Sequence, residues 1–222
     1  MTLQEAIRAR HSVRKYPEEA IEQDKIAVLE AATARVNRES GLHVQLVLEE
    51  PKAFSGGLLS YGTFSGVRNY WVMAGRKGMD EAVGYYGEQL VLLAQTLGLN
   101  SCWVGLTYKK IPGAFRLEAG EKVYCVIAVG YGQDEGVPHP ARPVERFYEA
   151  DGEVPEWFLR GMEAALLAPT AVHQQKFKFF LTDRRRVRAK ALFSLVGYTQ
   201  MDLGIVKYHF EIGAGSENFS WA

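Results

Sequence analysis

The amino-acid sequence predicts a fold of the α+β class in a chain of 222 residues. The first observation is that the sequence contains both helix and strand patterns. Residues 81–97 carry an apolar stripe at helical spacing, whereas 101–105 and 123–129 are short apolar runs typical of buried strands. The second is a hydrophobic content of 47%, which suffices for a sizeable core. The third is a partial repeat, because a helix–loop–strand pattern returns after residue 154.

The other elements follow from residue spacing and from glycine and proline positions. Further helices are expected at 2–10, 24–34, 157–167, 184–195 and 202–212. Further strands are expected at 43–48, 70–74 and 176–181. Loops are expected at 51–66, which is rich in Gly, Ser and Tyr, and at 136–143, which carries three prolines.

The repeat pairs the residues Glu30-Ala31-Ala32 with Glu163-Ala164-Ala165. The strand positions Val44, Leu46 and Leu48 then pair with Phe177, Phe179 and Leu181 at the same offset, without gaps. Few residues are identical, so this pattern alone is compatible with two unrelated helix–loop–strand units.

Composition excludes several classes of function. Lys+Arg and Asp+Glu each number 26, so a zero net charge gives no general argument for nucleic acid or membrane binding. The apolar runs are too short to span a bilayer, and the first residues form no signal peptide. Cys102 and Cys125 are expected to be buried free thiols in a reducing cytoplasm, with a disulfide as the lesser alternative. No zinc-ligand spacing is present.

Two motifs carry polar chemistry. Arg10-His11-Ser12-Val13-Arg14 offers several donors on one turn, which suits a phosphate. Cations that merely stabilise a helix C-terminus are the alternative, and composition alone favours that alternative. The second motif is Ala168–Phe177, rich in small and hydrogen-bonding residues between a helix and a strand. A polar turn after a helix is its simplest interpretation.

Together with two further segments, these motifs resemble the nitroreductase family of FMN flavoproteins. The family has an R-[RH]-S-x-[RK] pattern after its first helix, and Arg10–Arg14 matches it. Gly98–Gly105 is similar to its G-L-G-S-C-W-x-G element, and Val126–Tyr131 to a strand ending V-x-x-G-Y. The resemblance covers residues 2–146 in order, and 155–181 as a second copy. It implies a central, mostly antiparallel sheet flanked by helices.

One departure from the family pattern concerns chain organisation. The family's A-P-S-x-x-N motif is absent from 34–43 and occurs instead at 168–177. Family members place FMN at a homodimer interface, and the partner supplies this loop. The resemblance therefore implies a dimer collapsed into one chain. Residues 1–150 would form the nitroreductase-like core, and 151–222 the partial repeat that completes one FMN site. Further pairing of whole chains stays open.

The resemblance assigns roles residue by residue. Arg10, His11 and Ser12 would hold the ribityl phosphate, and Arg14 would lie near flavin N1 and O2, favouring the reduced anion. A late phosphate-binding arginine is matched by Arg142, although Pro140 stands where the family often has Lys. The remaining flavin contacts expected are Val104, Gly105 and Leu106 on one face and Pro169, Thr170, Ala171 and His173 on the other. His173 replaces the usual Asn and could still donate one hydrogen bond.

The resemblance implies an oxidoreductase whose flavin carries the chemistry, without a catalytic side chain or a metal. Electrons would pass from NAD(P)H through flavin N5 to a nitroaromatic, quinone or similar acceptor, in ping-pong order. The rival is a catalytically silent FMN-binding protein, a sensor or store. A dinucleotide fold starting at Gly130–Gly132 fails, because Val137–Pro140 follows where a helix must begin. The basic run 184–188 is interpreted as a solvated helix face rather than a nucleic-acid site.

Overall fold

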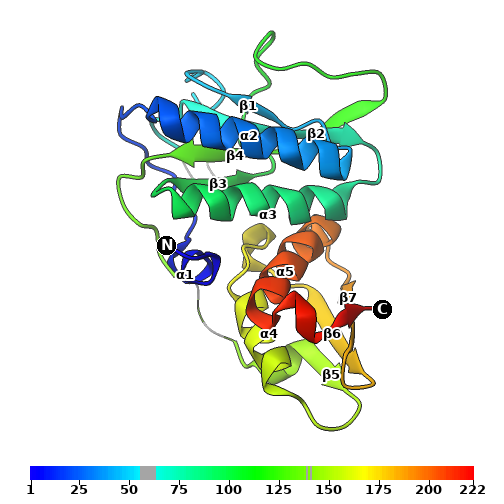
Figure 1. Cartoon of the computed structure of the whole chain (residues 1–222). Helices are drawn as coiled ribbons and strands as arrows, with labels where there is room; N and C mark the ends of the chain where they lie inside the picture. Colours follow the sequence, from blue (N-terminus) through cyan, green and yellow to red (C-terminus); the bar gives the residue numbers. More distant parts are fainter. Residues whose placement is uncertain (56–63, 139, 141) are drawn as a thin grey trace. The chain divides into compact units, whose positions relative to one another are not determined.

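The computed structural model describes residues 1–55, 64–138, 140 and 142–222 (Figure 1). Contacts divide the chain into two discontinuous units. Unit 1 contains Met1, Ala9–Met79 and Gln89–Pro138; unit 2 contains Thr2–Arg8, Asp80–Glu88 and His139–Ala222. Helix α3 (Asp80–Thr96) therefore begins in unit 2 and ends in unit 1. Most of the predicted loop 51–66, and residues 139 and 141 of the predicted loop 136–143, lie outside the described residues.

Unit 1 is built on a four-stranded sheet whose strands are all antiparallel to their neighbours. In spatial order the strands are β1 (Gln45–Val47), β2 (Asn69–Arg76), β4 (Glu121–Gly130) and β3 (Asn100–Val104). Seven of the eight β2 residues are buried, which explains why this strand is a continuous apolar run. The predicted antiparallel sheet and its four strands are confirmed.

Helix α2 (Gln23–Ser40) packs on this sheet (Figure 1). Leu29 and Val36 are fully buried, and Trp71 Nε1 on β2 donates a 2.9 Å hydrogen bond to Thr33 Oγ1. The helix is longer than the predicted 24–34, because the buried stripe continues to Val36. It ends at Gly41, whose left-handed φ of 70° allows its N–H to bond Asn37 O.

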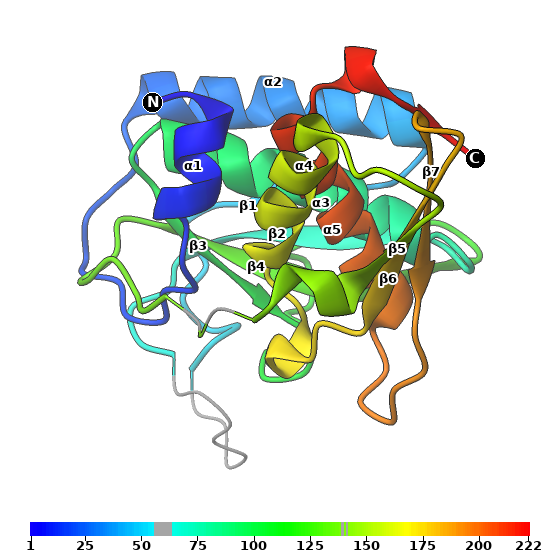
Figure 2. The same ribbon diagram turned by 90° about the horizontal axis from the view of Figure 1, so that it is seen from below.

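Unit 2 contains a second four-stranded sheet (Figure 2). Its strands in order are β5 (Tyr148–Ala150), β6 (Phe177–Thr182), β7 (Arg186–Ala191) and β8 (Ser220–Trp221). The β6–β7 pair is antiparallel, and both outer pairs are parallel. Helix α5 (Thr199–Ala214) packs on β6 and β7, and α4 (Glu156–Leu166) lies beside α5. Phe179 and Phe210 stack at 4.7 Å between ring centroids in this core. The short helices of the chain are α1 (Leu3–Ala9), η1 (Val144–Phe147), η2 (Ala171–His173) and η3 (Ser216–Asn218).

The helix predicted at 184–195 is wrong, since residues 186–191 form strand β7. Asp183 and Arg184 adopt left-handed φ angles of 51° and 59°, which turn the chain back into a hairpin with β6. Along β7, Arg and Lys alternate with buried or half-buried Val187, Ala189 and Ala191. This two-residue period is the strand signal. Within the basic run 184–188, Arg184 and Arg185 lie in the turn, and Arg186 and Arg188 lie on the exposed face of the strand.

Two glycines allow α3 and α5 to cross closely within unit 2. A Cβ at Gly84 would overlap the carbonyl of Met201, and a Cβ at Gly204 would overlap the carbonyl of Glu81. Both positions therefore require glycine for packing. Gly84 also faces Ile205, and Gly204 also faces Tyr85. Each glycine therefore contacts the residue three positions before the other glycine and the residue one position after it.

Candidate functional site

The segment after α1 is an ordered extended stretch along the edge of β3. Ser12 forms a parallel bridge with Ser101, and Val13 N donates to Ser101 O at 3.1 Å. Val13 and Tyr16 are buried in a small core with Cys102, and the Tyr16 hydroxyl donates to Val13 O at 2.8 Å. Ser12, Val13 and Tyr16 thus anchor the segment to unit 1.

The donors of this segment gather around the start of β3. Arg10 is only 4% exposed, whereas Arg14 is exposed, with its guanidinium 5.9 Å from the Phe64 ring centroid. Burial raises the pKa of the Cys102 thiol, and Arg14, the Ser12 hydroxyl and Arg10 oppose that rise. Cys102 and Cys125 are buried free thiols, as predicted.

The predicted residues 104–106 follow directly on β3. Val104 is buried in the unit 1 core with Tyr70 and Val126, so its side chain supports the sheet. Gly105 is half-buried, and Leu106 is 81% exposed. The structure therefore brings two of the predicted motifs, 10–14 and 100–106, side by side in unit 1.

The other predicted motif forms a loop in unit 2, between α4 and β6. Val172, His173 and Gln175 have left-handed φ angles of 47°, 53° and 45°. Such angles are uncommon outside glycine, and Val is disfavoured there because it is β-branched. Each costs about 1–3 kcal/mol and persists only where neighbouring contacts hold it. Asn and His are among the residues that tolerate this conformation best, which gives a physical reason for His173 in place of the family Asn.

A buried carboxylate that sequence reasoning missed holds this loop. Asp202, in the first turn of α5, is 3% exposed; its Oδ1 accepts from Ala171 N at 2.9 Å and its Oδ2 from Gln174 Nε2 at 2.7 Å. Burial raises the Asp202 pKa to about 6, and these two hydrogen bonds oppose the rise. In sequence the residue is only an acidic group near a helix start, so no local signal indicates its loop contacts.

Arg142 reaches the same loop. Its guanidinium donates to His173 O at 3.3 Å and is otherwise exposed. Pro169, Thr170 and Ala171 are half-buried, and the Thr170 hydroxyl accepts from Gln175 N at 3.0 Å. Unit 2 therefore unites all its predicted site residues. Those of unit 1 form their own group, and whether both groups serve one ligand stays a prediction. Ala141 of the segment around Arg142 lies outside the described residues.

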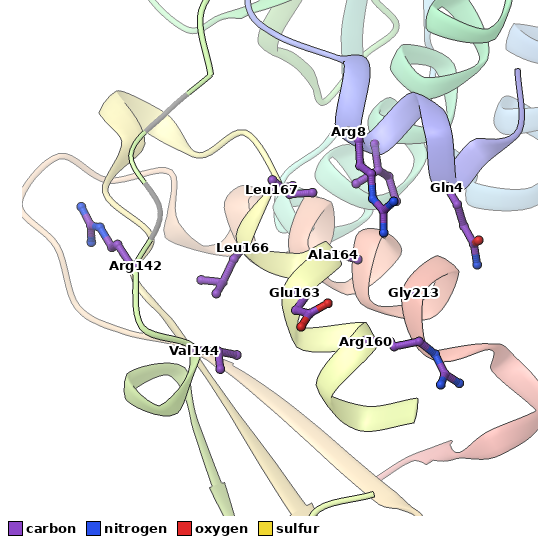
Figure 3. Close-up of a pocket in the computed structure, with 11 residues that line it drawn as sticks. Gln4, Arg8, Arg142, Val144, Arg160, Glu163, Ala164, Leu166, Leu167 and Gly213 are labelled. Carbon is purple, nitrogen blue, oxygen red and sulfur yellow. The ribbon is translucent and has the colours of Figure 1, made fainter. Parts of the chain in front are cut away.

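Unit 2 also contains a cavity of about 450 Å³ beside α4 (Figure 3). Its lining comprises Gln4, Ile7, Arg8, Arg142, Val144, Arg160, Glu163, Ala164, Leu166, Leu167 and Gly213. Leu166 and Leu167 directly precede the strained loop. Arg8 extends from α1 toward α4, while Arg142 and Arg160 stand at opposite ends of the view. The cavity thus has aliphatic walls with cationic groups at its rim.

The described residues show neither a metal-ligand cluster nor a membrane-spanning helix. Among those residues no three His, Cys, Asp or Glu side chains gather as metal ligands would. No helix within the part that the structure describes combines the length and the apolar character needed to cross a bilayer.

The antiparallel α+β fold and the cationic segment beside β3 define a nitroreductase-like protein. Residues 2–214 match the sequence profile of the family described as "Putative TM nitroreductase", and the chain belongs to that family. A structure named as a putative nitroreductase, from Thermotoga maritima, is similar over 98% of this chain and 85% of its own, with a TM-score of 0.69 and 23% identity.

Shorter relatives match part of the chain. A Parabacteroides distasonis protein, named as a putative NADH dehydrogenase/NAD(P)H nitroreductase, covers 66% of this chain and 96% of its own, with a TM-score of 0.52 and 23% identity. A Bacteroides thetaiotaomicron protein of the same name covers 65% and 95%, with a TM-score of 0.51 and 18% identity. These likenesses support the fold. No curated protein matches the chain by sequence.

Proposed function

We propose that this protein is an FMN-dependent oxidoreductase that passes two electrons from NAD(P)H to a nitroaromatic, quinone or similar acceptor. The observation that carries the proposal is the segment 10–14, which is held against Ser101 of β3 and carries Arg10, Ser12 and Arg14 within five consecutive residues. This donor set suits a phosphate monoester, and FMN is the phosphate-bearing cofactor that the resemblance to nitroreductases implies.

The proposed cofactor contacts in unit 1 have distinct roles. Arg10, His11 and Ser12 would bind the ribityl phosphate. Arg10 is held inside the protein, so its orientation is set before the ligand arrives. Arg14 is exposed and would place positive charge beside the flavin ring, stabilising negative charge that develops on reduction. The backbone of Val104 and Gly105, together with Leu106, would line one face of the ring, with Leu106 as the most accessible side chain.

In unit 2, Arg142 would add a second phosphate donor, and Pro169, Thr170, Ala171 and His173 would contact the ring. The loop is suited to this role because Asp202 and Gln174 hold its shape. When bound, FMN supplies the two-electron chemistry, which side chains of this kind do not provide. NAD(P)H as electron donor is consistent with the name of the Parabacteroides distasonis relative.

We further propose that the chain descends from a dimer whose two subunits became one polypeptide. The support is the reciprocal packing of α3 and α5: Gly84 faces Met201 and Ile205, whereas Gly204 faces Glu81 and Tyr85. Glu81, Gly84 and Tyr85 on α3 correspond to Met201, Gly204 and Ile205 on α5 at one constant distance in the sequence. Reciprocal contacts of this kind characterise an interface between two equivalent subunits.

An absorbance spectrum of the purified protein, followed by steady-state kinetics, tests the proposal. We expect bound flavin, NADPH or NADH oxidation that depends on nitrofurazone or menadione, and parallel double-reciprocal plots. Flavin that no nicotinamide reduces would favour the catalytically silent alternative. A protein that takes up no flavin would refute both.

A further inference from the structure

The loop 169–175 is held in a conformation that its own sequence disfavours. Val172, His173 and Gln175 are left-handed, and so is Tyr198, at the start of α5. Strained backbone of this density occurs where surrounding contacts over-determine the chain, and such places are enriched in binding sites. A group in unit 2 must therefore impose this conformation on the loop.

The contacts converge on Asp202. One carboxylate oxygen accepts from Ala171 N at 2.9 Å, and the other accepts from Gln174 Nε2 at 2.7 Å. The same Gln174 nitrogen donates to Gly197 O at 2.9 Å, which links the loop before α5 to the loop after α4. A single buried carboxylate thereby joins two left-handed stretches, around 172 and around 198.

We propose that Asp202 is the positioning residue for the flavin-contacting loop: through Ala171 and Gln174 it fixes the shape that residues 169–173 present to FMN. This inference rests on the proposed function. It extends that function by assigning a role to a residue that does not itself contact the cofactor.

The chemistry explains why a carboxylate is needed. Both partners are N–H donors, so both side-chain oxygens must accept, which only an Asp of this length provides here. In Asp202→Asn one oxygen becomes an NH₂ group that faces either Ala171 N–H or the Gln174 amide nitrogen. Rotating the Gln174 amide would satisfy the new donor, but would turn its oxygen toward Gly197 O. One contact is therefore lost in any arrangement.

The test compares Asp202→Asn and Gln174→Leu with Glu211→Gln. Glu211 lies on the same helix and also accepts two hydrogen bonds, from the Tyr85 hydroxyl at 2.6 Å and from Trp221 Nε1 at 2.7 Å, but it contacts no loop residue through them. It is the matched control for loss of a helix carboxylate. Far-ultraviolet circular dichroism checks that each full-length variant is folded.

Three readouts follow. Amide exchange in 169–175 should accelerate about tenfold in Asp202→Asn and Gln174→Leu, and not in Glu211→Gln. FMN Kd should rise about 10- to 100-fold in the two loop variants, since small displacements of a positioned group have effects of this size. The visible circular dichroism of bound FMN, recorded at saturating flavin, should change in those variants alone.

The outcomes separate this inference from the proposed function. If wild-type protein binds FMN and Asp202→Asn binds it with unchanged Kd and unchanged visible dichroism, the positioning role is overturned while the proposed function stands. Equal effects in Glu211→Gln would also overturn it, because the cause would then be general destabilisation. If wild-type protein binds no FMN, the proposed function fails, and the positioning role fails with it.

Discussion

His209 Nε2 lies 2.9 Å from Glu88 Oε1, and both side chains are fully buried in unit 2. His209 Nδ1 lies 3.1 Å from Ala164 O and must donate there, because a carbonyl oxygen only accepts. The pair therefore connects α3, α4 and α5 through polar contacts inside the core of unit 2.

Removing one member of this pair should strongly destabilise the protein. We expect His209→Leu and Glu88→Leu each to lower the free energy of unfolding by about 3–5 kcal/mol, because each breaks the buried contact between these two side chains. The double variant should lose clearly less than the sum of the two single losses. Urea denaturation measures all three values, and strict additivity would contradict an energetic coupling between them.

Gly204→Ala should destabilise the protein even though alanine favours helices by about 1 kcal/mol over glycine. The added Cβ would overlap the carbonyl of Glu81 and force α3 and α5 apart, which costs about 1–3 kcal/mol or more. Gln200→Ala, an exposed change in the same helix, should alter the free energy of unfolding by less than about 0.5 kcal/mol. Thermal unfolding of both variants measures these changes in stability. A stabilised Gly204→Ala protein would refute the close crossing of α3 and α5.

Stability should depend on pH through Asp202. Its pKa rises from an ordinary value of 3.8 to about 6 on folding, so the folded state holds the proton more tightly. The contribution of this group to the free energy of unfolding is fully present below pH 3.8 and is lost as pH rises through about 6. Relative to Asp202→Asn, the wild-type free energy of unfolding should fall by something on the order of 3 kcal/mol over that window. A difference that stays constant with pH would contradict the shift.

Arg10→Ala and Arg14→Ala should each weaken FMN binding about 10- to 100-fold, as expected for the loss of one charge-assisted hydrogen bond. Lys15→Ala is the matched control, since it removes an exposed cation adjacent to Arg14 in the sequence. Fluorescence quenching of FMN on titration with apoprotein gives the three dissociation constants. Unchanged affinity in both arginine variants would move the phosphate site elsewhere.

A fragment comprising residues 1–153 should neither bind FMN nor fold stably. It would keep all of α3 but lose α5, and so leave Glu88 without His209 and Tyr85 without Glu211. Size-exclusion chromatography and flavin absorbance test this expectation. A soluble, flavin-loaded fragment would contradict the proposal that residues 151–222 complete the site.

Much of the fold was predictable because local and tertiary preferences agree. The strands of unit 1 are apolar runs such as 123–129, and they are buried on both faces of the sheet. The 10–14 segment was recognisable because its donors are consecutive in the sequence. By contrast, β7 was mistaken for a helix, because Arg, Ala and Lys have high helix propensity although their alternation with Val187 indicates a strand.

The loop in unit 2 shows where prediction from sequence stops. The left-handed angles at Val172 and Gln175 run against the preferences of those residues, and they depend on Asp202, which is distant in the sequence. Only tertiary contacts connect such positions. His173 looked like a departure from the family pattern, but it adopts a left-handed conformation, which His tolerates as Asn does.

The division of α1 and α3 between units has a consequence for biosynthesis. Residues Thr2–Arg8 are made long before His139–Ala222, yet both segments belong to the same unit. Ala6 and Ile7, both buried in the native protein, therefore lack most of their unit until His139–Ala222 has been synthesised. Such long-range closure slows folding, so nascent chains of this protein should rely on chaperone protection more than those of a protein with consecutive domains.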